Sequence, residues 1–160
     1  MKFLSKNLKE TAQIASGFVK TALTKQNEDN KATIIGLYGE LGSGKTIFMK
    51  YLAESFGIKE TIQSPTFVIE KIYDLTPRFA SPSPYEGEGR DEIFEKLIHI
   101  DAYRIEKEEE MLNLGWNEII SNPKNLICIE WPEKIIGIMP THIMIKFEHV
   151  SETERKISIA

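Results

Sequence analysis

The 160-residue sequence is short of several features, and each shortage narrows what the chain can do. It has one cysteine, Cys128, so no disulfide can form within the chain, and the apolar residues around it indicate a buried thiol rather than a reactive one. Its three histidines and single cysteine show no zinc-type spacing. The N-terminus lacks the apolar core of a signal peptide, and no apolar run approaches the ~18 residues of a membrane helix. We therefore expect a cytoplasmic protein with no membrane contact.

Basic residues are not in excess either. Lysine and arginine number 20 against 24 acidic residues, which gives a net charge of −4 and a pI of about 5.5. Strong binding to a nucleic-acid backbone requires a basic surface, so we do not expect the isolated chain to hold RNA or DNA tightly. A role within a larger nucleic-acid complex stays open. The length predicts one domain over residues 1–160, large enough to bury a core.

The most informative segment is residues 39–46, which match the phosphate-binding pattern G-x-x-x-x-G-K-T. Glycines let the backbone turn tightly and present consecutive N–H groups to phosphate oxygens. In this pattern the lysine reaches the β- and γ-phosphates and the threonine hydroxyl ligates Mg²⁺. The predicted nucleotide-binding residues are therefore Glu40, Leu41, Gly42, Ser43, Gly44, Lys45 and Thr46.

The surroundings of this segment fit the same interpretation. Residues 32–38 form a short apolar, β-branched run that predicts a buried strand. Apolar residues then recur at helical spacing from Ile47 to Phe56, and Gly57 follows where a helix commonly ends. Strand, glycine loop and helix in this order predict an α/β P-loop domain that binds a nucleotide.

Other segments predict further elements. An amphipathic pattern predicts a helix over residues 8–22 with Ser5 as its N-cap. We expect strands near 68–73, at 96–101 and at 126–130, short helices at 106–114 and 116–120, and an antiparallel hairpin from 142–147 and 155–159. Residues 75–91 are rich in Pro, Gly and Ser, which predicts a mobile insertion loop. An inert loop is favoured there over a binding segment.

Two predicted strands end in an acid, and ligands gather at the carboxyl ends of strands in such sheets. Glu130 follows four apolar residues, so we predict that it is the second Mg²⁺ partner. Asp101 ends the other strand and is a candidate to orient or deprotonate an attacking water, the alternative being a cap of the following turn. His99 would face the same side as Asp101, and we expect a structural role for it because Mg²⁺ prefers oxygen ligands.

Several classes of P-loop protein fit poorly. The sequence has no Asn-Lys-x-Asp-type element for guanine, and it is too short for a motor ATPase with helicase elements. A small-molecule kinase usually needs an arginine-bearing lid, and residues 75–91 offer only Arg78 and Arg90. That kinase remains the alternative to an ATPase, and a nucleotide-gated binding module without useful hydrolysis is a second alternative.

The ordered set of motifs resembles the TsaE family, the small ATPases needed for threonylcarbamoyladenosine in bacterial tRNA. The resemblance covers about residues 5–160 apart from the insertion. Its motifs are the P-loop, Ser64-Pro65-Thr66-Phe67, His99-Ile100-Asp101-Ala102-Tyr103-Arg104, Leu114-Gly115 and Ile129-Glu130-Trp131-Pro132-Glu133.

The resemblance implies a single P-loop domain with a mixed sheet flanked by helices, and Mg²⁺-dependent ATP hydrolysis. It also implies action with the TsaB–TsaD heterodimer, which transfers the threonylcarbamoyl group, so that tRNA is met only indirectly. By position, Lys45 and Asp101 would be catalytic, and Thr46 and Glu130 would serve Mg²⁺. Thr66 would lie in a switch-like loop near the γ-phosphate. Trp131 and Tyr103 would be site or interface residues, the alternative being core packing.

Overall fold

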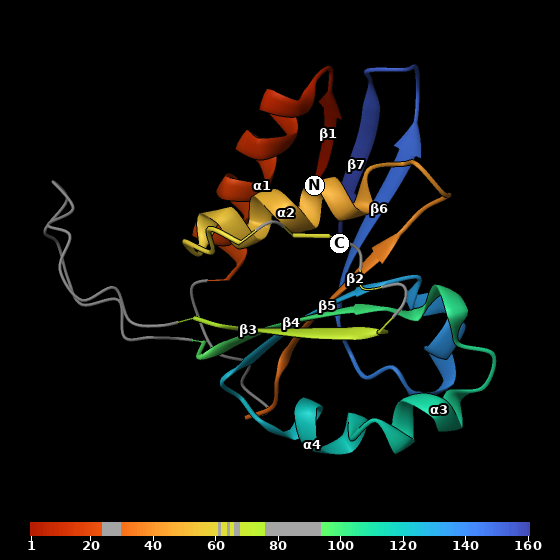
Figure 1. Ribbon diagram of the computed structural model, residues 1–160. Helices are drawn as coiled ribbons and strands as arrows, with labels where there is room; N and C mark the ends of the chain where they lie inside the picture. Colours follow the sequence, from red (N-terminus) through yellow and green to blue (C-terminus); the bar gives the residue numbers. More distant parts are fainter. Residues whose placement is uncertain (24–29, 61, 64, 66–67, 76–93) are drawn as a thin grey trace, which may run out of the picture.

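The computed structural model describes residues 1–23, 30–60, 62–63, 65, 68–75 and 94–160. These residues form a mixed sheet with helices on both faces (Figure 1). The strands are β1 (Lys2–Ser5), β2 (Thr33–Tyr38), β3 (Glu70–Asp74), β4 (Lys96–Asp101), β5 (Asn125–Glu130), β6 (Ile143–His149) and β7 (Arg155–Ile159). The helices are α1 (Leu8–Ala22), α2 (Lys45–Ser55), α3 (Glu108–Asn113) and α4 (Trp116–Ser121), with short 3-10 segments η1 (Ala102–Arg104) and η2 (Pro132–Ile138).

Among the described residues the sheet has seven strands in the order β1-β7-β6-β2-β5-β4-β3. The central strand β2 runs parallel to β5 on one side and to β6 on the other. β4 is parallel to β5, whereas β3, β7 and β1 pair antiparallel with their neighbours. The α/β fold class with a mixed sheet is therefore confirmed, and so is the predicted antiparallel hairpin at the C-terminal end.

The apolar residues of β2 and β5 are buried on both faces, which explains why these strands appear as uninterrupted apolar runs in the sequence. On one face, Ile35 and Leu37 pack with Phe18 of α1 and Phe48 of α2. On the other face a separate cluster joins the sheet to η1, α3, α4 and η2 through Ile34, Ile105, Met111, Trp116 and Ile135. Cys128 is fully buried, as predicted, and burial raises the pKa of its thiol.

The start of the chain differs from the prediction. Ser5 does not cap α1, because it is the last residue of an unpredicted strand, and its buried hydroxyl lies 2.8 Å from Thr11 Oγ1. Asn7 is the N-cap instead, and its side chain accepts a hydrogen bond from Glu10 N at 3.0 Å. The strand was missed because three of its four residues are exposed and its partner β7 lies at the other end of the chain.

Two further elements, β3 and α3, begin later in the chain than the sequence predicted. The strand expected from residue 68 begins only at Glu70, since Ile69 has a positive φ of 66° that breaks the extended backbone. The helix expected over 106–114 spans only Glu108–Asn113. It begins later because the Glu110 carboxylate accepts hydrogen bonds from the N–H groups of Glu106 and Lys107, which places these two residues before the first turn. Of the expected insertion, only Leu75 belongs to the described residues, and residues 76–91 lie outside them.

Candidate functional site

The loop of residues 39–46 joins β2 to α2 and is shaped by close contacts with the C-terminal hairpin. Gly39, Gly42 and Gly44 have positive φ values of 145°, 77° and 103°. A Cβ at Gly39 would lie 2.6 Å from the carbonyl oxygen of Phe147, and a Cβ at Gly44 would lie 2.7 Å from Arg155 Nη1. The two outer glycines are therefore required both by backbone conformation and by space.

Lys45 lies inside this loop and is almost completely buried. Its ammonium donates to the carbonyl oxygens of Gly39 at 2.6 Å and Glu40 at 2.9 Å. The same nitrogen lies 3.9 Å from the centre of the Trp131 ring, a cation–π contact. Burial lowers the pKa of Lys45, and the charge of Glu130 opposes that change. The lysine is thus a positive charge held at the concave side of the loop.

Thr46 and Glu130 meet across the loop. The Thr46 hydroxyl lies 2.9 Å from Oε1 and 2.8 Å from Oε2 of Glu130, a residue that is 3% exposed. Fully buried His99 approaches the same carboxylate, with its Nε2 2.9 Å from Oε1. This contact gives His99 the structural role expected of it, that of holding the Glu130 carboxylate in place. The identity of its partner was not predicted, because it depends on the pairing of β4 with β5.

Asp101 lies beside Glu130, because β4 and β5 are neighbours and their last residues are in register. Its Oδ1 accepts a hydrogen bond from the N–H of Tyr103 at 2.9 Å, so the cap that was the alternative to a catalytic role is present. The buried Asp101 side chain also lines the same cavity as Lys45. A carboxylate can hold the turn with one oxygen and still offer lone pairs to a water, so both roles are compatible.

Trp131 and Tyr103 cover one side of the cavity. Trp131 follows β5 directly with a positive φ of 60°, and its ring centre lies 5.2 Å from that of Tyr103. Tyr103 is 48% exposed, and Trp131 is partly buried against the cluster below the sheet. Core packing alone does not describe either residue, since both line the cavity.

These side chains surround one cavity of about 420 Å³. It is lined by Leu41, Gly42, Gly44, Lys45, Thr46, Ile47, Asp101, Tyr103, Glu130 and Trp131. Two other predicted residues lie next to it: exposed Glu40, which contributes its carbonyl to Lys45, and Ser43, whose buried hydroxyl has no hydrogen-bond partner among the described residues. Thr66, with Ser64 and Phe67 of the same motif, lies outside the described residues.

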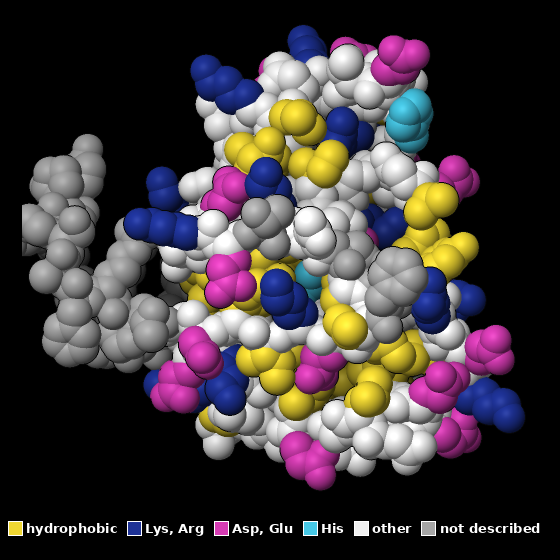
Figure 2. Space-filling model, viewed as in Figure 1, with side chains coloured by type: hydrophobic (Ala, Val, Ile, Leu, Met, Phe, Trp, Pro, Cys, Tyr) yellow, Lys and Arg dark blue, Asp and Glu magenta, His cyan; other side chains and the backbone are white. Residues whose placement is uncertain are grey.

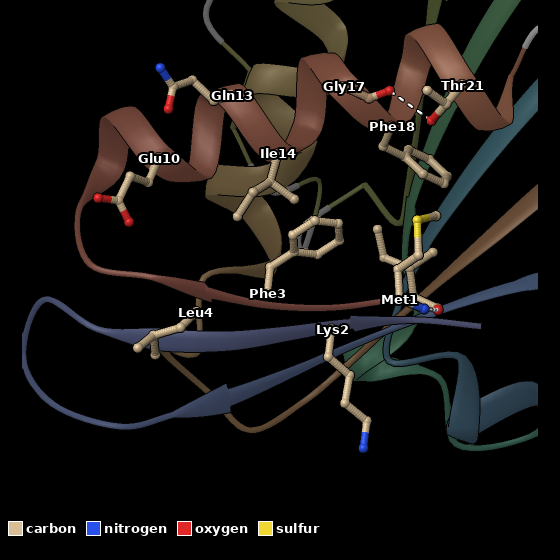
Figure 3. Close-up of a pocket in the computed structure, with 11 residues that line it drawn as sticks. Met1, Lys2, Phe3, Leu4, Glu10, Gln13, Ile14, Gly17, Phe18 and Thr21 are labelled. Atoms are coloured by element: carbon tan, nitrogen blue, oxygen red, sulfur yellow. Dashed lines mark hydrogen bonds between the residues drawn. The ribbon is translucent and has the colours of Figure 1, made fainter.

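A larger cavity, of about 650 Å³, lies between α1 and β1 (Figure 3). Phe3 and Ile14 point toward each other across it, and Lys2 points away. Its one acidic residue, Glu10, already accepts the N–H of Lys6 at 2.8 Å in the helix cap. Reactive groups do not converge there, so the smaller cavity is the candidate site.

The donors around the smaller cavity fit a nucleotide with Mg²⁺. A phosphate group would be favoured by three features: the glycines with positive φ, the buried Lys45 ammonium and the N-terminus of α2. Thr46 and Glu130 supply oxygen ligands, which Mg²⁺ prefers, and neighbouring ligands of an octahedral Mg²⁺ lie about 2.9 Å apart. The distances of 2.8 and 2.9 Å between these oxygens match that spacing.

The mixed sheet and the glycine loop between β2 and α2 define a P-loop NTPase fold. The family model of the threonylcarbamoyl adenosine biosynthesis protein TsaE matches residues 5–157, and the chain belongs to the TsaE family. The tRNA threonylcarbamoyladenosine biosynthesis protein TsaE of Rickettsia prowazekii is 34% identical over 153 residues, 94% of this chain and 88% of that protein. The TsaE of Borreliella burgdorferi is 36% identical over 107 residues, 67% of this chain and 65% of that protein.

A crystal structure of Bacillus subtilis YdiB matches the fold with a TM-score of 0.69 at 26% identity, covering 99% of this chain and 83% of that one. The resemblance first inferred from the motifs is therefore confirmed at the level of the family. Within the described part of the chain, the helices are too short or too polar to cross a membrane.

Proposed function

We propose that this chain is a Mg²⁺-dependent ATPase that serves as an accessory subunit in the synthesis of threonylcarbamoyladenosine in tRNA. The observation that carries the proposal is the contact of Thr46 with Glu130 beside Lys45. This contact places the two oxygen ligands expected for Mg²⁺ next to the cation expected for phosphate, although Glu130 lies 84 positions after Thr46 in the sequence. Membership of the TsaE family supplies the pathway.

Each residue has a role in this proposal. Backbone N–H groups of residues 40–46 bind phosphate oxygens, and Lys45 leaves the Gly39 and Glu40 carbonyls to bind the β- and γ-phosphates. Thr46 and Glu130 would hold Mg²⁺, which when bound neutralises charge on the phosphates. His99 keeps the Glu130 carboxylate in place, and Asp101 orients the water or takes its proton. Trp131 and Tyr103 limit the access of other water to the site.

We further propose that the chain acts through protein partners, the TsaB–TsaD heterodimer, and meets tRNA only within that complex. On the face shown in Figure 2, acidic and basic side chains are interspersed rather than gathered by sign. Together with a net charge of −4, this surface does not favour the phosphate backbone of tRNA. A site in the cytoplasm, where tRNA is modified, follows from this role.

ATP labelled at the γ-phosphate separates this proposal from its alternatives. The purified chain is incubated with Mg²⁺ and labelled ATP, with and without TsaB–TsaD and with a mixture of metabolites. We expect labelled inorganic phosphate, released faster with the partners present. Label on a metabolite without partners would indicate a small-molecule kinase, and bound but unhydrolysed ATP under all conditions would indicate a nucleotide-gated binding module.

A further inference from the structure

Arg155 is a basic residue that lies outside the P-loop motif in sequence but contacts the P-loop in the structure. It is the first residue of β7 and pairs with His149 of β6 and with Ser5 of β1. β6 runs parallel to β2, so Arg155 lies at the edge of the sheet where β2 enters the P-loop. The preceding turn is fixed by hydrogen bonds from Val150 N and Ser151 N to Glu154 O, which hold the backbone of Arg155 in place.

The guanidinium of Arg155 packs directly against the P-loop. A Cβ at Gly44 would come within 2.7 Å of Nη1, 3.4 Å of Cδ and 3.5 Å of Cζ. Gly44 immediately precedes Lys45 and is the N-cap of α2, where no side chain caps the helix. The P-loop segment that carries Lys45 is therefore in direct contact with Arg155.

Within the described part of the chain, one nitrogen of this half-buried guanidinium is left without a partner. Its Nη1 is buried and has no hydrogen-bond partner among the described residues, and Arg155 forms no ion pair with any of them. A buried donor without a partner is unfavourable. A cation at the positive end of a helix dipole is unfavourable too, and here Arg155 and Lys45 both lie at the start of α2. An anion placed between them would relieve both conditions.

We propose that Arg155 is a further nucleotide-binding residue, whose guanidinium contacts the phosphate chain at its α-phosphate end; this rests on the function proposed above. The strand order gives the direction. Glu130 and Asp101, on β5 and β4, lie on one side of β2, and Arg155 lies on the other. Because the Mg²⁺ and γ-phosphate end belongs beside Glu130, the α-phosphate and nucleoside end extends toward β7.

The test measures the Kd of the full chain for ADP and for ATP, with Mg²⁺, by calorimetry. Arg155→Gln should raise both Kd values about tenfold and by the same factor, because both nucleotides carry the α-phosphate. Lys156→Gln removes the same charge from the neighbouring exposed position and should change neither value more than about twofold. Arg155→Lys keeps a cation without the planar fork and should fall between them.

Thermal unfolding distinguishes binding from a structural role. Without nucleotide, Arg155→Gln should melt no lower than the wild type, since it removes an unpaired buried donor, whereas the rise in Tm on adding ADP should be smaller. Unchanged Kd values in Arg155→Gln and Arg155→Lys would overturn the inference, as would a loss confined to ATP, which would place the contact at the γ-phosphate. If the wild type bound neither nucleotide, the proposed function itself would fail, and this is seen before any variant is compared.

Discussion

The hydroxyl of Thr46 donates to the carboxylate of Glu130 across 84 positions of sequence, with its oxygen 2.9 and 2.8 Å from the two carboxylate oxygens. Thr46 lies in the first turn of α2 and Glu130 ends β5, so the contact exists because β2, which leads into the loop before α2, is a parallel neighbour of β5. Both oxygens lie within the cavity that also holds Lys45. This arrangement of a P-loop hydroxyl and a strand-end carboxylate is the geometric basis of the magnesium proposal.

Lys45→Ala should abolish productive ATP binding or hydrolysis. The substitution removes the buried ammonium that donates to the loop carbonyls of Gly39 and Glu40, and with it the charge expected at the β- and γ-phosphates. Titration with ATP and release of phosphate measure the effect, with circular dichroism to verify the fold. Near-normal ATPase activity in a folded Lys45→Ala protein would contradict the P-loop assignment.

Glu130→Gln should lower Mg²⁺-dependent ATP turnover at least ~10-fold, about 1.4 kcal/mol in the barrier. The substitution keeps the shape of the side chain but removes the charge that faces Thr46 and His99. Turnover is measured over a range of Mg²⁺ concentrations, beside Asp101→Asn. If Asp101→Asn lost magnesium dependence while Glu130→Gln turned over normally, the roles of the two carboxylates would be reversed.

Gly44→Ala should destabilise the folded chain and weaken nucleotide binding together. The added methyl group would lie 2.7 Å from Arg155 Nη1, and the backbone φ of 103° is strained for alanine. We expect a fall in Tm of about 4 °C or more, measured by thermal unfolding. Gly17→Ala in α1 is the control, because a Cβ there meets nothing within 4 Å and its Tm should not fall. An equal Tm for Gly44→Ala and the wild type would show that the loop relaxes freely.

Glu70→Gln should stabilise the protein at neutral pH and not at acidic pH. Burial raises the pKa of Glu70, and its Oε2 has no partner among the described residues. A raised pKa gives stability that is present below the ordinary carboxyl value and is lost as the pH rises through the folded-state value. The Tm of Glu70→Gln should therefore exceed that of the wild type by up to ~3 °C at pH 7, and the gain should vanish toward pH 4.

Exposed Glu152→Gln is the control for that measurement and should leave Tm unchanged at both pH values. A gain for Glu70→Gln that persisted undiminished at acidic pH would show that the effect comes from packing rather than from ionisation.

Local patterns predicted the centre of this molecule well. The apolar run of β2, the glycine loop and the helical spacing of α2 lie next to each other in sequence, so their order was enough. The acids at the ends of β4 and β5 were also found, because parallel strands bring their carboxyl ends together. The features that were not predicted depend on pairing between distant segments: β1 forms against β7, His99 contacts Glu130 from the neighbouring strand, and Arg155 contacts Gly44 from the last strand.

A pull-down of the purified chain with TsaB–TsaD, with and without ATP and Mg²⁺, beside tRNA binding by the chain alone at ~150 mM salt, measures whether the chain is a nucleotide-dependent accessory subunit. We expect an association with the heterodimer that changes with nucleotide and is lost in Lys45→Ala, and no tight binding of tRNA to the isolated chain. Tight binding of tRNA by the chain alone, with no effect of nucleotide on its association with TsaB–TsaD, would contradict the role of accessory ATPase and favour an enzyme that acts on RNA directly.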